Sequence, residues 1–148
     1  MTDPGTDPPY AVAFNIDAPR DPQYLLEVLE AAAEAVRVAN HQTLGHEALR
    51  YPSEADTAIR YLATLASRLP QLLEQVSGWL QAEQAAGRIE MAHDSTYLAS
   101  ALAADAARLQ LEQAQAHARM LQQALDAAAA VTCDMAGVED AGSEEGSG

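Results

Sequence analysis

The chain has 148 residues, a mass of 15.7 kDa and a formal net charge of -14, with 49% hydrophobic and 5% aromatic residues. This length suits one domain with short tails, and a composition rich in alanine and poor in aromatic residues favours packed helices over a β-sandwich or barrel. All eight basic residues are arginines scattered between Arg20 and Arg119. They form no basic stripe, so we expect no direct binding of nucleic acid.

The first residues combine a proline-rich tail with a β-like pattern. Residues 1–9 hold three prolines and a glycine and predict a disordered N-terminal tail. Apolar and small residues then alternate over residues 10–16, with the larger ones at Tyr10, Val12, Phe14 and Ile16. This is the period of a half-buried strand, so we expect a short β-like segment here.

The first helix is predicted from Pro22 to about His41. Asp21 is suited to cap its N-terminus, and Pro22 suits the first helical position, where its missing N–H costs nothing. Gly45 and Pro52 mark residues 42–52 as a loop. This loop is short, so we expect the first helix to fold back beside residues 53–70.

The second helix is predicted from Ser53 to Gly87, with Asp56 as part of a capping box. Pro70 falls inside it and is expected to bend it. Apolar residues recur at heptad spacing: Leu62, Leu65, Leu69, Leu72, Val76 and Trp79, widened on one side by Ile59, Ala66, Leu73 and Leu80. We expect the first of these stripes, Leu65 and Leu69 included, to be buried against a neighbouring helix.

The third helix is predicted from Asp94 or Ser95 to about Cys133. Its inward face is again spaced in heptads: Ala104, Ala107, Leu111, Ala114, Ala118, Leu121, Leu125 and Ala128. With a turn near Glu90, the two long helices pair as an antiparallel hairpin in which facing residues have numbers that sum to about 180. Val76 is then expected opposite Ala104, so that large side chains meet small ones.

Together these elements predict an all-α fold. It consists of a long antiparallel helical hairpin with a shorter N-terminal helix packed on it, a three-helix bundle preceded by the β-like segment. The helical domain is expected over residues 10–133. Residues 134–148 carry a charge of -5 and are predicted to form a disordered acidic tail.

The sequence gives no sign of catalysis. Neither a glycine-rich phosphate loop nor a nucleophile elbow is present, and His41 and His46 lack further ligands at metal-binding spacing. We therefore expect no enzymatic activity, no catalytic or metal site and no cofactor. Cys133 is the one cysteine and no apolar run approaches a membrane span, so a cytoplasmic protein is predicted.

Four stretches carry a resemblance: Asn40 to Leu44, Leu49 to Ser53, Leu69 to Gln75 and Trp79-Leu80, of which Leu69-Pro70-Gln71-Leu72-Leu73 is the most distinctive. Over residues 10–130 the chain resembles a group of small, largely uncharacterised actinomycete helical proteins, some of which accompany plasmids or other mobile elements. The resemblance implies an accessory or regulatory role. It carries over no catalytic residue.

The pattern therefore favours a protein–protein interaction or oligomerisation module. The residues expected to bind a partner lie towards the hairpin turn: Leu73, Val76, Trp79, Leu80, Leu98 and Leu102. A homodimer or another protein is the expected partner, with no membrane and no known small molecule. The alternatives are an acidic inhibitor that occupies a basic nucleic-acid-binding surface of a partner protein, and a small-molecule sensor with a pocket beside Trp79.

Overall fold

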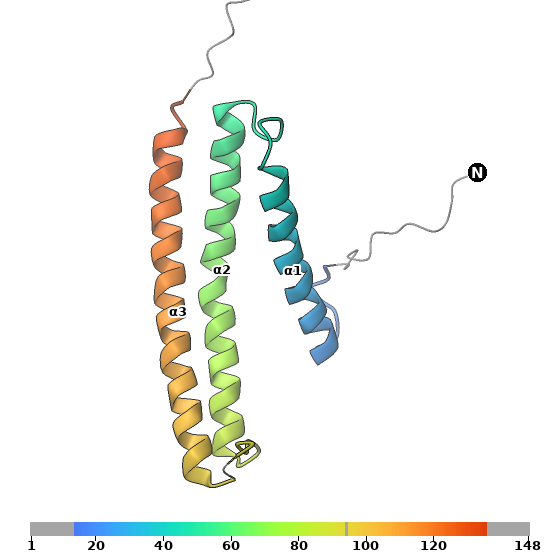
Figure 1. Ribbon diagram of the computed structural model, residues 1–148, viewed down its shortest axis with the longest axis vertical. Coiled ribbons are helices and arrows are strands. Elements are labelled where there is room, and N and C mark those ends of the chain that lie inside the picture. Colours follow the sequence, from blue (N-terminus) through green and yellow to red (C-terminus); the bar gives the residue numbers. More distant parts are fainter. Residues whose placement is uncertain (1–13, 94, 136–148) are drawn as a thin grey trace, which may run out of the picture. The chain divides into compact units, whose positions relative to one another are not determined.

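The computed structural model describes residues 14–93 and 95–135, and the described chain is all α-helical (Figure 1). Three helices follow one another: α1 (Pro22–Gln42), α2 (Pro52–Ala85) and α3 (Tyr97–Thr132). The chain divides between Arg50 and Tyr51 into two compact units, one with α1 and one with α2 and α3. The all-α prediction is confirmed. The packing of the first helix on the hairpin and the single domain over residues 10–133 stay predictions.

The segment before α1 is not a strand where it is described. Of the predicted β-like segment, residues 10–13 lie outside the described residues, and Phe14 to Ile16 run as coil into a turn. Asn15 explains the turn: its side chain accepts a hydrogen bond from the backbone of Asp17 at 3.0 Å, and its carbonyl accepts one from Ala18 at 3.2 Å. Such a local asparagine turn competes with extended structure, so the alternating pattern does not decide the backbone here.

Helix α1 begins where the sequence predicts. The carboxylate of Asp21 accepts a hydrogen bond from the backbone of Gln23 at 3.1 Å, and Pro22 occupies the first helical position. The hydroxyl of Tyr24 lies 2.9 Å from the backbone nitrogen of Asn15, which donates to it and ties the preceding turn to the first turn of the helix. His41 lies in the last turn, where the helix dipole favours a positive charge.

Helices α2 and α3 begin at different residues from those predicted. Tyr51 precedes α2, and its backbone N–H donates to the carboxylate of Glu54 at 3.0 Å, so Pro52 takes the first position. The capping box predicted at Ser53 is therefore wrong by two residues, and Asp56 is free for another role. Helix α3 starts at Tyr97, after Thr96, whose hydroxyl accepts from the backbone of Ala99 at 3.3 Å.

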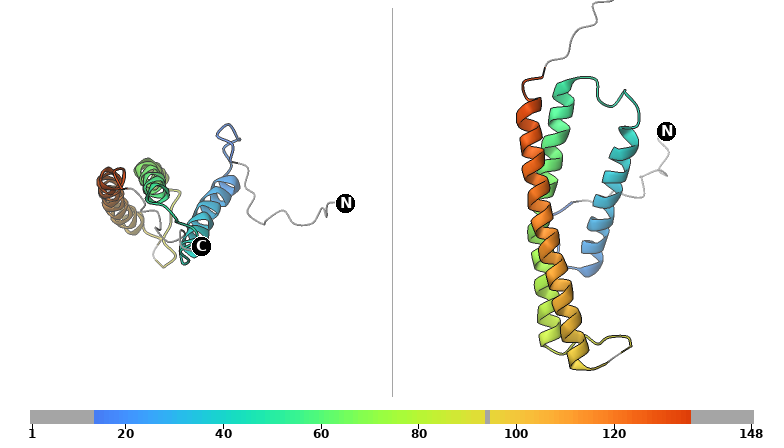
Figure 2. Two further views of the ribbon diagram at one scale, coloured as in Figure 1. Left: turned by 90° about the horizontal axis from the view of Figure 1, so that it is seen from above. Right: turned by 60° about the vertical axis from the view of Figure 1, so that its left-hand side comes forward.

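The two long helices run side by side as the predicted antiparallel hairpin, joined by residues 86–96 (Figure 2). Their register differs from the predicted one: facing residues have numbers that sum to 185 or 188 instead of 180, which is a shift of between one and about two helical turns. The side-chain amide of Gln81 contacts Ala104, which was predicted opposite Val76: its nitrogen donates to the Ala104 carbonyl at 2.9 Å. At the other end, the hydroxyl of Thr132 donates to Asp56 at 2.7 Å. The hairpin loop is centred beyond Glu90, which moves every facing pair in the same direction.

The surface that α2 and α3 share, called the seam below, is made of small side chains. The residues buried along it are Ala63, Ala66, Pro70, Ser77 and Gln84 from α2, and Ser100, Ala104, Gln115, Ala118 and Ala129 from α3. Ile59, Leu73, Leu80, Leu111 and Leu125 lie half-buried at the same heptad positions. Small residues let the helix axes approach closely, which is why packing selects them. Among the described residues, no large side chain is fully buried.

The seam of α3 is thus largely the predicted one, whereas the seam of α2 is shifted by one residue. Leu65, predicted in the core, is 42% exposed, and Trp79, placed by the heptad pattern in the core, is 61% exposed. Leu69 is half-buried. Pro70 is buried on the seam, and α2 continues through it as one helix (Figure 1), so the predicted bend at Pro70 stays a prediction.

Candidate functional site

The hairpin has two unlike faces, which follow from the position of the seam. In an α-helix, successive residues are rotated by 100° about the helix axis. The residue before a seam position and the residue after it therefore lie on opposite sides of the seam. Because the two helices are antiparallel and face each other, the residues that precede seam positions lie on the same side of the hairpin in both helices. One face therefore collects the residues before the seam positions, and the other face collects the residues after them.

The residues after the seam form a polar face. Its members are Arg60, Ser67, Gln71 and Glu74 from α2, with Arg108, Glu112, Arg119 and Gln123 from α3. Two arginines are held there by ion pairs: Arg60 with Asp56 at 2.8 Å, and Arg108 with Glu112 at 2.7 Å. The hydrogen bond that Arg108 donates to Glu112, more than the one it donates to Asp105, raises the pKa of Arg108. This face is built for contact with water.

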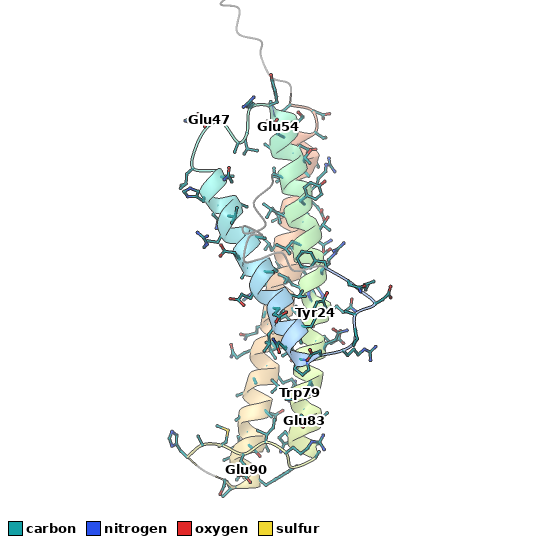
Figure 3. All side chains as sticks on the ribbon, turned by 90° about the vertical axis from the view of Figure 1, so that its right-hand side faces the viewer. Tyr24, Glu47, Glu54, Trp79, Glu83 and Glu90 are labelled. Atoms are coloured by element: carbon teal, nitrogen blue, oxygen red, sulfur yellow. The ribbon has the colours of Figure 1, made fainter. Side chains whose placement is uncertain are left out.

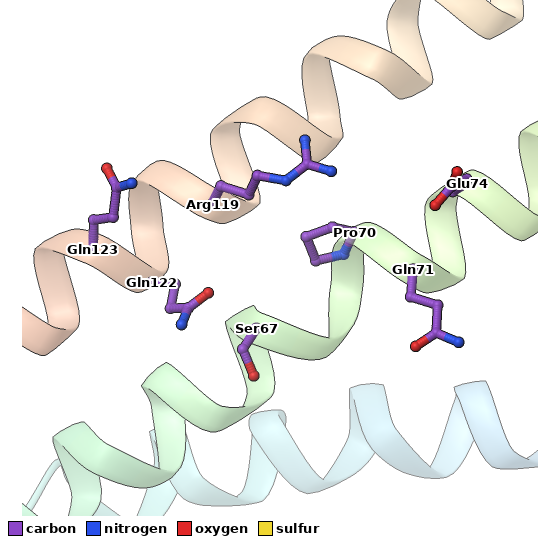
Figure 4. Close-up of a pocket in the computed structure, with 7 residues that line it drawn as sticks. All are labelled: Ser67, Pro70, Gln71, Glu74, Arg119, Gln122 and Gln123. Carbon is purple, nitrogen blue, oxygen red and sulfur yellow. The ribbon is translucent and has the colours of Figure 1, made fainter.

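A pocket of about 490 Å³ opens on the polar face between the two helices (Figure 4). It is lined by Ser67, Pro70, Gln71, Glu74, Arg119, Gln122 and Gln123. Residues that follow the seam in α2 and in α3 thus lie around one hollow, as the antiparallel geometry requires. The charged residues that line it, Glu74 and Arg119, are both exposed.

The residues before the seam form the opposite face, called the uncharged face below. Between Ala58 and Trp79 of α2 it consists of Ala58, Leu62, Leu65, Leu69, Leu72, Val76 and Trp79, with Glu83 as the next position at its edge; from α3 it takes Ala103, Ala106, Gln110, Ala114, His117, Leu121, Ala124 and Ala128. Up to Trp79 on α2 and from Ala103 to Ala128 on α3, none of the residues at these positions is a carboxylate or an arginine. In a chain with 20% charged residues, such a face is unusual for a surface left in water.

Large side chains on this face are exposed. Besides Trp79, they are Leu62, Leu65 and Val76 on α2 and Leu121 on α3. Trp79 lies in the half of α2 nearer the hairpin loop (Figure 3). Beyond it, the charged residues resume with Glu83, which pairs with Arg88 at 2.6 Å. The hydrogen bond from Arg88 lowers the pKa of Glu83, so this pair marks a charged edge of the uncharged face.

The six residues predicted to bind a partner point in three directions. Leu73 and Leu80 occupy seam positions and are half-buried. Val76 and Trp79 lie on the uncharged face. Leu98 and Leu102 are 66% and 62% exposed, and their helical positions turn them away from α2. Helix geometry thus brings Val76 and Trp79 together on the uncharged face, while Leu98 and Leu102 share a different exposed side of α3.

Sequence reasoning missed the α3 half of the uncharged face, in particular Ala103, Ala106 and Gln110. The signal was present: at spacings of three and four residues from Ala103 to Ala128, no charged residue occurs. This pattern was missed because an alanine-rich segment predicts a helix without indicating which side of it faces a neighbour. In addition, the predicted seam of α2 lay one residue from the observed one.

The described residues give no other site. They contain no group of three or more His, Cys, Asp or Glu side chains that could hold a metal ion. Within the described helices, no segment has both the length and the apolar character that crossing a bilayer demands. Comparison with protein-family models, curated proteins and solved structures finds no match for this chain. Its function is therefore argued from the hairpin surface.

Proposed function

We propose that this protein is a non-enzymatic helical interaction or oligomerisation module, with an accessory or regulatory role, that associates with another protein chain through the uncharged face. The observation that carries the proposal is the contrast between a thin seam and a large apolar surface. The buried hydrophobic residues of the hairpin are all alanines, while leucine, valine and tryptophan side chains remain exposed beside them.

The energetics favour a partner for this face. Full burial of a large apolar side chain contributes roughly 1.5–3 kcal/mol. On the seam only alanines are fully buried among the hydrophobic residues and the large side chains are half-buried, so the two helices gain only part of that. A partner that covers Val76 and Trp79 supplies the missing burial. Depletion of charged residues, with an aromatic residue in the patch, is also what the centre of a protein interface shows.

The alternative, an acidic inhibitor of a nucleic-acid-binding partner, has support from the net charge of -14. A mimic of nucleic acid needs dense carboxylates on a folded surface. In the hairpin, however, arginine neutralises several of them: Asp56, Glu83 and Glu112 each pair with one. Much of the excess charge belongs to residues 1–21 and 134–148, which together carry -8. The uncharged face therefore supports an interaction module more strongly than the net charge supports an acidic inhibitor.

Two matched variants test the proposal. Gln110→Glu places a carboxylate on the uncharged face, and Gln123→Glu makes the same isosteric change on the polar face of the same helix; both side chains are exposed. The tagged full chain and both variants are used to capture proteins from the native host, including the chain's own untagged copies. We expect specific association in the wild type and in Gln123→Glu and its loss in Gln110→Glu.

Salt separates the two functions in the same experiment. Association through apolar burial survives high salt, whereas binding of a basic partner by exposed carboxylates weakens as the ions screen it. Capture that vanishes at high salt and is indifferent to Gln110→Glu favours the acidic inhibitor. Absence of any capture that depends on residue 110 contradicts the interaction module.

A further inference from the structure

We propose that the occupant of the uncharged face is a second copy of this chain, which packs on the half nearer the hairpin loop and forms a two-fold arrangement of four helices. This inference rests on the proposed function and names its partner. Three features of the described hairpin carry it: the sizes of the side chains on the two arms, the levels of those side chains along the hairpin, and the area of the face.

The two arms carry side chains of unlike size in this half. Helix α2 presents Leu69, Leu72, Val76 and Trp79, whereas α3 presents Ala103, Ala106, Gln110 and Ala114. Two copies can meet face to face in two symmetric ways. If the two-fold axis is perpendicular to the helices and parallel to the face, α2 of one copy packs on α2 of the other, so that large side chains meet large side chains. An axis along the hairpin sets α2 of each copy on α3 of the other, so that large side chains meet small ones.

The levels of these side chains match in the second arrangement. The contacts of Gln81 with Ala104 and of Asp56 with Thr132 set which residues of α2 and α3 lie at the same height. They put Trp79 level with residues 106–109 and Val76 level with residues 109–112. A two-fold axis along the hairpin preserves height. Trp79 of one copy therefore lies over the α3 segment of the second copy that contains Ala106. By symmetry, Trp79 of the second copy lies over the same segment of the first.

The helices so joined are antiparallel neighbours, as in four-helix bundles with short loops. Each Trp79 gains a small-residue surface to pack on, and no carboxylate or arginine is buried. Tryptophan is among the residues that most often dominate interface energetics. Across the interface Val76 meets the uncharged amide of Gln110, which explains why a carboxylate at position 110 is the sharpest disruption.

The area is sufficient for a weak dimer. At 1.5 Å per residue, this half of the face is roughly 25 Å long, and two helices 10–12 Å in diameter make it roughly 20 Å wide. Each copy then contributes roughly 500 Å², which gives the lower limit of about 1,000 Å² in total for a specific interface. We expect a concentration-dependent dimer with a Kd in the range of about 1–100 µM.

Sedimentation equilibrium of the full chain over a range from low to high micromolar concentration tests the inference. We expect a reversible monomer–dimer equilibrium in the wild type and in Gln123→Glu, and a Kd raised about tenfold or more in Gln110→Glu, where the new carboxylate would be desolvated. Circular dichroism of both variants checks that they fold. A wild type that is monomeric throughout, or a dimer indifferent to Gln110→Glu, overturns the inference.

A cross-linking experiment tests the orientation. In a Cys133→Ser background, chains with Val76→Cys are mixed with chains carrying Gln110→Cys and exposed to an added oxidant. The axis along the hairpin predicts mixed disulfides between the two kinds of chain. Disulfides formed mainly between two Val76→Cys chains would place α2 on α2 and overturn the arrangement.

Failure of this inference is distinguishable from failure of the proposed function. A monomeric wild type that still captures a different protein, in a manner lost in Gln110→Glu, removes the second copy as partner and leaves the interaction module standing. A monomeric wild type with no capture dependent on residue 110 removes both.

Discussion

The hydroxyl of Thr132 donates a hydrogen bond to the carboxylate of Asp56 over 2.7 Å, although the two residues lie 76 positions apart in the chain. The bond ties the last turn of α3 to the beginning of α2, at the end of the hairpin opposite its loop. Asp56 also accepts from Arg60 at 2.8 Å. The Arg60 guanidinium, and after it the Thr132 hydroxyl, lowers the pKa of Asp56 below its ordinary value.

This relationship predicts a pH-dependent contribution to stability. Because the pKa of Asp56 is lower in the folded chain than in the unfolded chain, its contribution is present above the unfolded value of about 4 and is lost as the pH falls through the folded value. Thr132→Val removes the donor. We expect a lower Tm for this variant than for the wild type at pH 7, and a difference that shrinks towards zero as the solution is made strongly acidic.

A threonine in the same hairpin serves as the control. The hydroxyl of Thr64 donates only within its own helix, to the carbonyl of Arg60 at 3.0 Å. Thr64→Val should therefore show no such dependence on pH. Equal behaviour of the two variants between neutral and acidic pH would show that the bond between Thr132 and Asp56 does not stabilise the hairpin.

Adjacent residues of α2 test the position of the seam. Ala66 is 1% exposed, whereas Leu65 is 42% exposed. Enlarging the buried side chain by Ala66→Leu overpacks the seam and should cost about 1–3 kcal/mol of unfolding free energy. Leu65→Ala removes a side chain that is only partly buried and should cost about 1 kcal/mol. Chemical denaturation measures both. A larger cost for Leu65→Ala than for Ala66→Leu would restore the seam that the heptad of large residues predicts.

The sequence predicts the hairpin because its information is local and periodic. Capping at Asp21, the loop at Gly45 and long apolar repeats place three helices within a few residues of their observed ends. The prediction places the seam of α2 one residue too early because the leucines at heptad positions, such as Leu62 and Leu69, are more hydrophobic than the smaller residues that follow them. Where two helices approach closely, small side chains fit better than large hydrophobic ones. This preference can be recognised only when the contacting surfaces of both helices are compared.

The candidate site was predictable only in part, for the same reason. Val76 and Trp79 belong to the uncharged face, but Leu73 and Leu80 were chosen with them because the seam was taken to lie elsewhere. An error of one residue in the seam moves a residue from the seam to a face or from a face to the seam, as happened to Leu65 and Leu73. Once the seam is known, the series of uncharged residues at spacings of three and four from Ala103 to Ala128 can be read from the sequence.

Two glycines of the hairpin should respond in opposite ways to alanine. Gly87 follows α2 with a positive φ of 69°, a conformation that costs an L residue about 1–2 kcal/mol. Gly78 lies inside α2, and an added Cβ there meets nothing within 4 Å. We expect Gly87→Ala to destabilise the protein by about 1–2 kcal/mol and Gly78→Ala to stabilise it by about 0.5–1 kcal/mol.

Thermal and chemical unfolding of these two variants measure both effects. Neither added methyl group has a neighbour to clash with, so the backbone alone decides the signs. A destabilised Gly78→Ala would mean that this position is covered by something the hairpin does not itself provide. A neutral Gly87→Ala would mean that the connection after α2 is free to adopt another conformation.

Two glutamines near the hairpin loop give the last prediction. The side chain of Gln84 is buried on the seam, and its amide nitrogen has no hydrogen-bond partner. The amide nitrogen of Gln81, one turn earlier, donates to the Ala104 carbonyl at 2.9 Å. Methionine has a similar length and shape without the polar groups. Because a buried unpaired donor costs about 1–3 kcal/mol, Gln84→Met should stabilise the protein by about 1 kcal/mol.

Gln81→Met is the matched control and should have the opposite sign. It removes a hydrogen bond between the two helices, whose net contribution is about 0.5–1.5 kcal/mol, so the variant should unfold at a lower denaturant concentration than the wild type. Urea titrations of the two variants and the wild type decide the matter. Destabilisation by both changes would show that the amide of Gln84 is paired in solution, which requires a group from outside the hairpin seam to reach it.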